Sequence, residues 1–186
     1  MKITLAQQNY HIGNIIGNEQ KIVEGIEFAK KLGSDLVVFS ELSICGYPPK
    51  DLLLFDSFVN DCHQSLLRIA AHTEGISVLV GLPRFNHANH GKRLFNAACF
   101  IKDGKIESYI DKTKIPNYDI FDESRYFEPA KNWQSIKLKA FNIAVTICED
   151  IWDDFGGRPY ETEPLQMMKE AKPDFVINLS ASPFDY

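Results

Sequence analysis

No run of uncharged apolar residues in the 186-residue sequence approaches the roughly 18 that a membrane-spanning helix needs. The apolar stretch after Met1 and Lys2 is also too short for the core of a signal peptide, because polar residues begin at Gln7. These absences give no sign of membrane insertion or export. We therefore expect a cytoplasmic protein with no membrane partner.

Excess positive charge is likewise missing, since 20 Lys and Arg residues stand against 25 Asp and Glu residues. A nucleic-acid-binding surface needs clustered basic residues, so nucleic acid is not an expected partner. Low-complexity composition is absent too. Apolar residues make up 45% and charged residues 24%, as in an ordinary folded globular domain.

Cysteine is sparse, and its four positions (45, 62, 99 and 148) include no pair at metal-ligand or redox spacing. Reduced thiols are the simplest interpretation. His87 and His90 come nearest to a metal-binding motif, but two imidazoles in a polar loop without a firm carboxylate are more often solvated. The sequence therefore predicts no metal site.

What the sequence does contain is an alternation of strand-like and helix-like patterns. The run 36–39 is too short for a helix and fits a strand covered on both faces. From Asn96 onward two pairs of short strands appear, the first closed by the two-residue turn Asp103-Gly104. The expected strands are 3–6, 36–39, 76–82, 97–102, 105–110, 136–139, 142–147 and 174–180, and the expected helices are 18–31, 58–69 and 163–171. Hairpins among βαβ units predict one α/β domain with a mixed sheet.

Three reactive residues follow predicted strands, where functional groups of α/β sheets tend to gather: Glu41, Lys112 and Cys148. A thiol that attacks a carbonyl carbon, a carboxylate that takes its proton and an ammonium that stabilises the oxyanion form a set suited to acyl transfer. Taken singly, each also has an ordinary interpretation: a buried structural cysteine, a solvated or helix-capping glutamate and a surface lysine. The set is what favours catalysis.

The sequence around each of these residues resembles a motif of the nitrilase superfamily. These motifs are the glutamate motif at 40–49 (SELSICGYPP), the lysine motif at 112–118 (KTKIPNY) and the nucleophile motif at 146–152 (TICEDIW). Further details resemble one branch, the glutaminase domain of the glutamine-dependent NAD synthetases. They are 46–53 (GYPPKDLL), 116–118 (PNY) followed by 121–127 (FDESRYF), and 148–152 (CEDIW). Near the end of the chain, 180–184 (SASPF) resembles a later segment of the same family.

The resemblance implies an αββα sandwich with mixed sheets and a Glu-Lys-Cys triad. Glu41 would be the general base, Lys112 the oxyanion-stabilising lysine and Cys148 the nucleophile that hydrolyses L-glutamine through a thioester. The resemblance implies four further roles. Tyr118 would contact the substrate glutamine, and Ser182 would contact its amino-acid end. The backbone N–H of Glu149 would be a second oxyanion donor, and Glu123 would be an additional glutamate of the pocket.

The resemblance also bears on what lies outside these residues. In the family the glutaminase domain runs on and an ATP-dependent synthetase domain follows, so 1–186 is expected to be a partial glutamine amidotransferase domain, incomplete at its C-terminus. Ammonia would pass to that C-terminal domain, which amidates deamido-NAD to NAD. ATP, magnesium and deamido-NAD would belong there, and no cofactor is expected in these residues. A homo-oligomer is expected for the parent protein.

Two other functions remain open. The first is a stand-alone amidase of the same superfamily that acts on another small amide, and a longer reading frame with an ATP-pyrophosphatase signature would separate it from the synthetase. The second is a non-catalytic interaction module of the same fold. The joint presence of Glu41, Lys112 and Cys148 disfavours that module, because a decayed site is expected to lose at least one of them.

Overall fold

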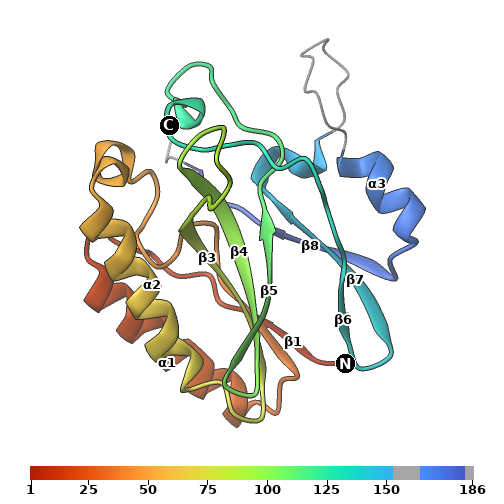
Figure 1. Cartoon of the computed structure of the whole chain (residues 1–186). Coiled ribbons are helices and arrows are strands. Elements are labelled where there is room, and N and C mark those ends of the chain that lie inside the picture. The colour runs from red at the N-terminus through yellow and green to blue at the C-terminus, as the bar shows by residue number, and fades with distance from the viewer. Residues whose placement is uncertain (153–163, 183–186) are drawn as a thin grey trace.

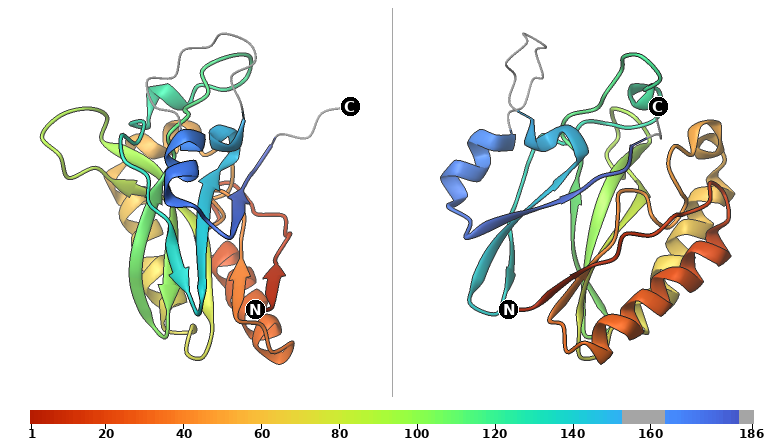
Figure 2. Two further views of the ribbon diagram at one scale, coloured as in Figure 1. Left: turned by 90° about the vertical axis from the view of Figure 1, so that its right-hand side faces the viewer. Right: turned by 180° about the vertical axis from the view of Figure 1, so that it is seen from behind.

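Two mixed β-sheets stack face to face, with α1 and α2 outside one sheet and α3 outside the other (Figure 1, Figure 2). The computed structural model describes residues 1–152 and 164–182. The strands are β1 (Ile3–Leu5), β2 (Leu36–Val38), β3 (Ser77–Phe85), β4 (Leu94–Lys102), β5 (Lys105–Asp111), β6 (Ile136–Leu138), β7 (Phe141–Ile147) and β8 (Phe175–Leu179). The helices are α1 (Ile15–Lys31), α2 (Asp56–Ala70) and α3 (Pro164–Ala171), with 3-10 turns η1 (Lys50–Leu54), η2 (Glu123–Arg125) and η3 (Cys148–Ile151). In this part of the chain no helix combines the length and the apolar character needed to span a bilayer.

The larger sheet has the order β1-β2-β3-β4-β5, with β1 to β3 parallel and the β3-β4 and β4-β5 pairs antiparallel. The predicted hairpin is confirmed, because Asp103 and Gly104 both adopt positive φ, of 46° and 78°, between β4 and β5. Two successive positive φ values are what a tight hairpin turn between twisted strands requires.

The smaller sheet has the order β6-β7-β8, with β6 antiparallel and β8 parallel to β7. The predicted pairing of β6 with β7 is confirmed, but the turn lies one residue earlier than expected. Lys139 adopts a φ of 54°, which ends β6 at Leu138 and lets β7 begin at Phe141. Both predicted hairpins therefore exist, but they lie in different sheets.

Helix α1 begins three residues before the predicted start because Asn14 caps it. The Asn14 side-chain oxygen accepts a hydrogen bond from the Gly17 N–H at 3.1 Å. Asn18, the predicted first residue, is instead buried inside the helix, where its amide donates to the backbone oxygens of His11 and Ile44. Helix α3 begins at Pro164, and the predicted start at residue 163 lies outside the described residues.

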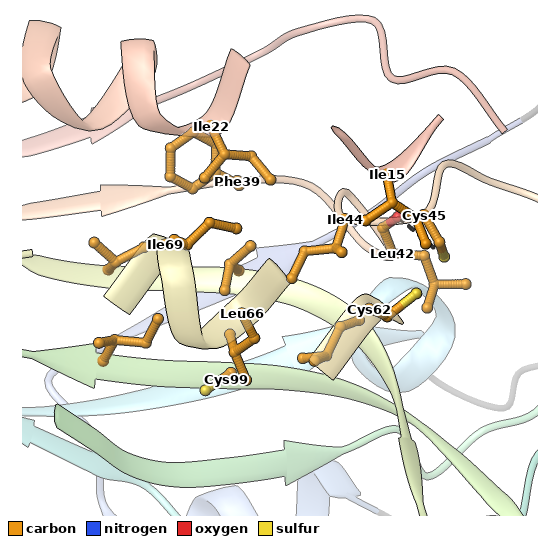
Figure 3. Packing of buried hydrophobic residues seen from close by; sticks show 14 of the residues in the cluster. Ile15, Ile22, Phe39, Leu42, Ile44, Cys45, Cys62, Leu66, Ile69 and Cys99 are labelled. Carbon is orange, nitrogen blue, oxygen red and sulfur yellow. Dashed lines mark hydrogen bonds between the residues drawn. The ribbon is translucent and has the colours of Figure 1, made fainter. Parts of the chain in front are cut away.

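Alternate residues of the central strands point into two separate hydrophobic cores. Val37 and Val78 face α1 and α2, where Ile22, Leu66 and other apolar side chains fill the first core (Figure 3). Leu36 and Leu79 face the other sheet and form the second core with residues of β6, β7 and β8. This two-residue period explains why β2 and β3 read as continuous apolar runs, since both faces are covered.

The layered arrangement brings several strand ends together. The chain leaves β2, β5, β7 and β8 at the same end of the sandwich, the upper end in Figure 1. The segments that follow these four strands contain Glu41, Lys112, Cys148 and Ala181, respectively.

Candidate active site

Glu41 lies in the loop that follows β2, and its side chain is fully buried. The neighbouring side chains of Leu42 and Ile44 point into the first core and anchor the loop (Figure 3). The Ile44 N–H also donates to the Gly81 backbone oxygen on β3 at 3.1 Å. The solvated glutamate that position alone suggests is therefore wrong.

Gly81 allows the Glu41 loop to approach the sheet. A Cβ at Gly81 would lie 2.3 Å from the Leu42 nitrogen and 2.5 Å from the Ser40 oxygen, and only backbone movement relieves such contacts. We expect Gly81→Ala to lower the free energy of unfolding by roughly 3 kcal/mol or more in urea denaturation. The control is Gly75→Ala, where a Cβ meets open space and only a φ of 76° opposes it, so the loss should be about 1 kcal/mol. Equal losses in the two variants would contradict this account.

Lys112 follows β5 directly, and its ammonium group is buried between two carboxylates. Its Nζ lies 2.7 Å from Oε1 of Glu41 and 2.9 Å and 3.0 Å from the two carboxylate oxygens of Glu123. Burial lowers the pKa of Lys112, but the two carboxylates outweigh burial and hold the net pKa above its ordinary value. The side chain is a fixed cation, not the surface lysine that position alone suggests.

Glu123 lies in η2, and both of its carboxylate oxygens accept hydrogen bonds from the Lys112 ammonium. Burial raises the pKa of Glu123, while the Lys112 charge acts in the opposite direction. Tyr47 donates its hydroxyl to Glu123 Oε1 at 2.9 Å. Burial and the Glu123 charge raise the pKa of Tyr47, so the phenol remains a donor.

Cys148 stands where β7 ends, with a φ of 50° in the left-handed region that side chains other than glycine rarely adopt. The buried carboxylate of Asp150 supports this turn. It accepts hydrogen bonds from the N–H groups of Ile147 at 3.1 Å, Thr113 at 3.0 Å and Lys114 at 2.7 Å. Burial raises the pKa of Asp150 to about 6, although these N–H groups lower it. One carboxylate thus ties the exit of β5 to the exit of β7.

The Cys148 thiol interacts electrostatically with both Glu41 and Lys112. Burial, followed by the Glu41 charge, raises the pKa of Cys148 to about 11, whereas Lys112 and a hydrogen bond with Ser180 lower it. At neutral pH the sulfur is therefore a protonated thiol. An attack by this sulfur on a carbonyl carbon needs a base to remove the proton.

The remaining predicted residues lie around this cluster. The Tyr118 hydroxyl donates to Oε1 of Glu149, the residue directly after Cys148, and Glu149 itself is buried. Ser182 is exposed after β8 and borders a pocket of about 280 Å³ that reaches Glu41. The structure gives these positions, and the contacts of Tyr118, Glu149 and Ser182 with a substrate stay predictions.

Three further groups belong to the cluster and were not anticipated: Asn96, Tyr47 and the backbone of Ala181. Asn96 Nδ2 donates to Glu41 Oε1 at 2.8 Å, and the Ala181 N–H donates to Glu41 Oε2 at 3.1 Å. A polar residue inside the apolar run of β4 was the available signal for Asn96. Nothing in the sequence distinguishes the Ala181 N–H from any other backbone donor.

Three aromatic side chains that follow the lysine motif belong to the hydrophobic cores. Tyr126 and Phe127 are buried in the first core, and Trp133 packs against the second. Within residues 1–152 and 164–182, no group of three or more His, Cys, Asp or Glu side chains is arranged to hold a metal ion.

Comparison with known sequences shows similarity along nearly the whole chain. A family model for carbon-nitrogen hydrolases matches residues 2–158. The chain is 41% identical to a glutamine-dependent NAD(+) synthetase of Synechocystis sp. over 98% of its length, and 39% identical to one of Thermotoga maritima over 99%. It spans 34% and 30% of those two proteins, about a third of the length of these curated relatives.

Solved structures also resemble this chain over nearly its whole length. The glutamine-dependent NAD+ synthetase of Acinetobacter baumannii, determined in complex with ADP, superposes with a TM-score of 0.85 at 34% identity, covering 98% of this chain and 32% of that one. An amidase of the nitrilase superfamily from Nesterenkonia has a TM-score of 0.80 at 18% identity, covering all of this chain and 66% of its own. The second likeness concerns the fold alone. The predicted nitrilase-like α/β fold with mixed sheets is confirmed.

Proposed function

Because the chain belongs to the carbon-nitrogen hydrolase family, we propose that it hydrolyses the side-chain amide of L-glutamine through a covalent intermediate on Cys148. The observation that carries this proposal is the buried cluster in which the Lys112 ammonium lies 2.7 Å from the Glu41 carboxylate, and both charges act on the pKa of the Cys148 thiol. The names of the similar relatives supply the substrate.

In the first step the Cys148 sulfur attacks the amide carbon and its proton passes to Glu41. General-base assistance is required because the pKa of Cys148 lies at about 11, so a free thiolate is scarce at neutral pH. The carbonyl oxygen becomes an oxyanion. The Lys112 ammonium and the backbone N–H of Glu149 stabilise that charge.

The tetrahedral species then collapses. The carbon–nitrogen bond breaks, Glu41 returns its proton to the departing nitrogen, and ammonia leaves behind a thioester between Cys148 and the glutamyl group. Water, deprotonated by Glu41, attacks the thioester carbon in the second half. The carbon–sulfur bond breaks, the thiol regains a proton, and glutamate is released.

Recognition of glutamine falls to residues beside the thiol. Tyr118 and Glu149 already form a hydrogen-bonded pair next to Cys148, which suits contact with the polar end of an amino acid. Ser182 borders the pocket that reaches Glu41 and would contact the amino-acid end of the substrate. A partly buried polar pair of this kind favours glutamine over a simple aliphatic amide, because only glutamine offers donors and acceptors to match it.

The similar relatives are named glutamine-dependent NAD(+) synthetases, so the ammonia would serve NAD synthesis, which we propose to be the ATP-dependent amidation of deamido-NAD. That reaction, together with ATP, magnesium and deamido-NAD, would belong to a synthetase domain outside residues 1–186. The same role predicts a cytoplasmic, homo-oligomeric parent protein.

The test is hydrolysis of glutamine beside acetamide and propionamide, with ammonia release measured and the Cys148 peptide examined by mass spectrometry after rapid quenching. We expect ammonia from glutamine and a glutamyl adduct on Cys148. Turnover of the aliphatic amides but not of glutamine would favour the amidase alternative. A folded chain that hydrolyses none of the three amides and forms no adduct would favour the interaction module.

A further inference from the structure

We infer that Asn96 is a positioning residue that selects which oxygen of Glu41 receives the thiol proton, an inference that rests on the proposed hydrolysis. Asn96 lies on β4 and is fully buried, although the rest of that strand's interior is almost entirely apolar. A buried amide is expected to have its hydrogen-bonding groups paired. In the described part of the chain, however, Asn96 Oδ1 has no partner.

The contacts of Asn96 join two of the charged members of the cluster, Glu41 and Lys112. Its side-chain Nδ2 donates to Glu41 Oε1 at 2.8 Å, and its backbone oxygen accepts the Lys112 N–H at 2.8 Å. Asn96 therefore hydrogen-bonds the Glu41 carboxylate through its side chain and the Lys112 backbone through its main chain.

The donors around Glu41 are distributed unequally between its two oxygens. Oε1 accepts from both Lys112 Nζ and Asn96 Nδ2, which engages both of its lone pairs. Oε2 accepts from the Ala181 N–H alone among the described residues, and so keeps one lone pair for a proton. Ala181 directly follows Ser180, whose side chain hydrogen-bonds the Cys148 thiol. Of the two oxygens, Oε2 is the one with a free lone pair, and its donor Ala181 is next in sequence to Ser180, so the geometry assigns Oε2 as the acceptor of the thiol proton.

Asn96 matters to this assignment because its amide occupies a lone pair that a proton would otherwise reach. Removing the amide frees one lone pair of Oε1 and takes one donor away from the ionised carboxylate. Hydrogen bonds to an ionised group favour that form, so loss of the Asn96 donor should be visible in the pH dependence of the reaction. The other charged or titratable groups that face Glu41 are Lys112 after β5, Glu123 in η2, Tyr47 in the loop after β2 and Cys148 after β7. All of them remain in an Asn96 variant, so a shift in the pH profile reports the lost donor.

Asn96→Leu is the test variant because its fold should survive. Leucine has a similar volume and removes the unpaired Oδ1, while Lys112 and Ala181 still satisfy Glu41. Asn142→Leu is the matched control. Asn142 on β7 also has a bonded Nδ2, which donates to the Ala171 oxygen at 2.9 Å, and an Oδ1 that has no partner among the described residues. Its hydrogen bonds in that part of the chain join Ala171 and Asp174, away from the cluster.

For Asn96→Leu we expect kcat for glutamine hydrolysis to fall roughly 10- to 100-fold with KM nearly unchanged, as for loss of a hydrogen bond to a charged group. The acid limb of the kcat/KM profile should move to higher pH, because that limb reports the essential base of the free enzyme. The rate of Cys148 alkylation by iodoacetamide, which needs no glutamine, should show the same shift. Asn142→Leu should change stability and leave both profiles in place.

The outcomes separate this inference from the proposed function. Asn96→Leu with the wild-type rate and pH profile would overturn the inference and leave glutamine hydrolysis standing. A wild-type chain that hydrolyses no amide would refute the function, while the alkylation profiles would still judge the role of Asn96. If Asn96→Leu does not fold, Asn96→Ser replaces it, because a serine hydroxyl is too short to make the same contact with Glu41. An acid limb that stays at its wild-type pH in Asn96→Ser would also overturn the inference.

Discussion

Cys148→Ala is expected to abolish glutamine hydrolysis, lowering turnover by about 10⁴-fold or more. The reason is that no other sulfur stands at this strand end. The remaining cysteines, at 45, 62 and 99, are all buried in the first core. Without the thiol no thioester forms, and the glutamyl adduct should disappear from the mass spectrum together with ammonia release.

The control for this change is Cys99→Ala, the same substitution at a fully buried thiol of β4. It should lower the free energy of unfolding by roughly 1 kcal/mol and leave turnover intact. In a longer protein that carries the proposed synthetase domain, Cys148→Ala should spare NAD formation from free ammonia. Loss of both the glutamine-dependent and the ammonia-dependent reaction would mean that Cys148 is structural or that the two-domain proposal is wrong.

Much of the fold was predictable because its strands and helices have strong local signals. The run 36–39 and the Asp103-Gly104 turn sit where the sequence places them, since burial on both faces and positive φ each demand particular residue types. The separation of the two hairpins into different sheets was not available from periodicity. It depends on which strands pair over long sequence distances, and the sandwich was anticipated only through the family resemblance.

In the candidate site, too, some residues could be predicted from local sequence signals and others could not. Glu41, Lys112 and Cys148 could be named because each follows a strand and lies in a recognisable motif. Their supporting partners are harder to find, because a hydrogen bond such as that from Ala181 to Glu41 joins residues 140 positions apart and uses only the backbone. Asn96 gave a partial signal as an amide within an apolar strand. The sequence shows that such a residue needs a partner but does not say which one.

Lys112→Met is the second change expected to have a large effect, and it should act on both activity and stability. Loss of the ammonium removes one oxyanion donor, which suggests a decrease of roughly 100- to 1,000-fold in glutamine turnover. It also leaves the buried carboxylates of Glu41 and Glu123 facing each other without a cation, which should lower the free energy of unfolding by roughly 3–5 kcal/mol. The pKa of Cys148 should rise further, because Lys112 is among the groups that lower it.

Three measurements keep these effects apart: turnover under conditions where the variant is folded, urea denaturation, and the pH dependence of Cys148 alkylation. Lys105→Met is the matched control, since Lys105 is an exposed lysine on β5, the strand that precedes Lys112, and its loss should change none of them. A folded Lys112→Met chain whose turnover stays within tenfold of the wild type would remove Lys112 from the oxyanion site. If stability fell while turnover and alkylation held, the ammonium would serve only to neutralise Glu41 and Glu123, and the oxyanion would have to be stabilised by backbone N–H groups alone.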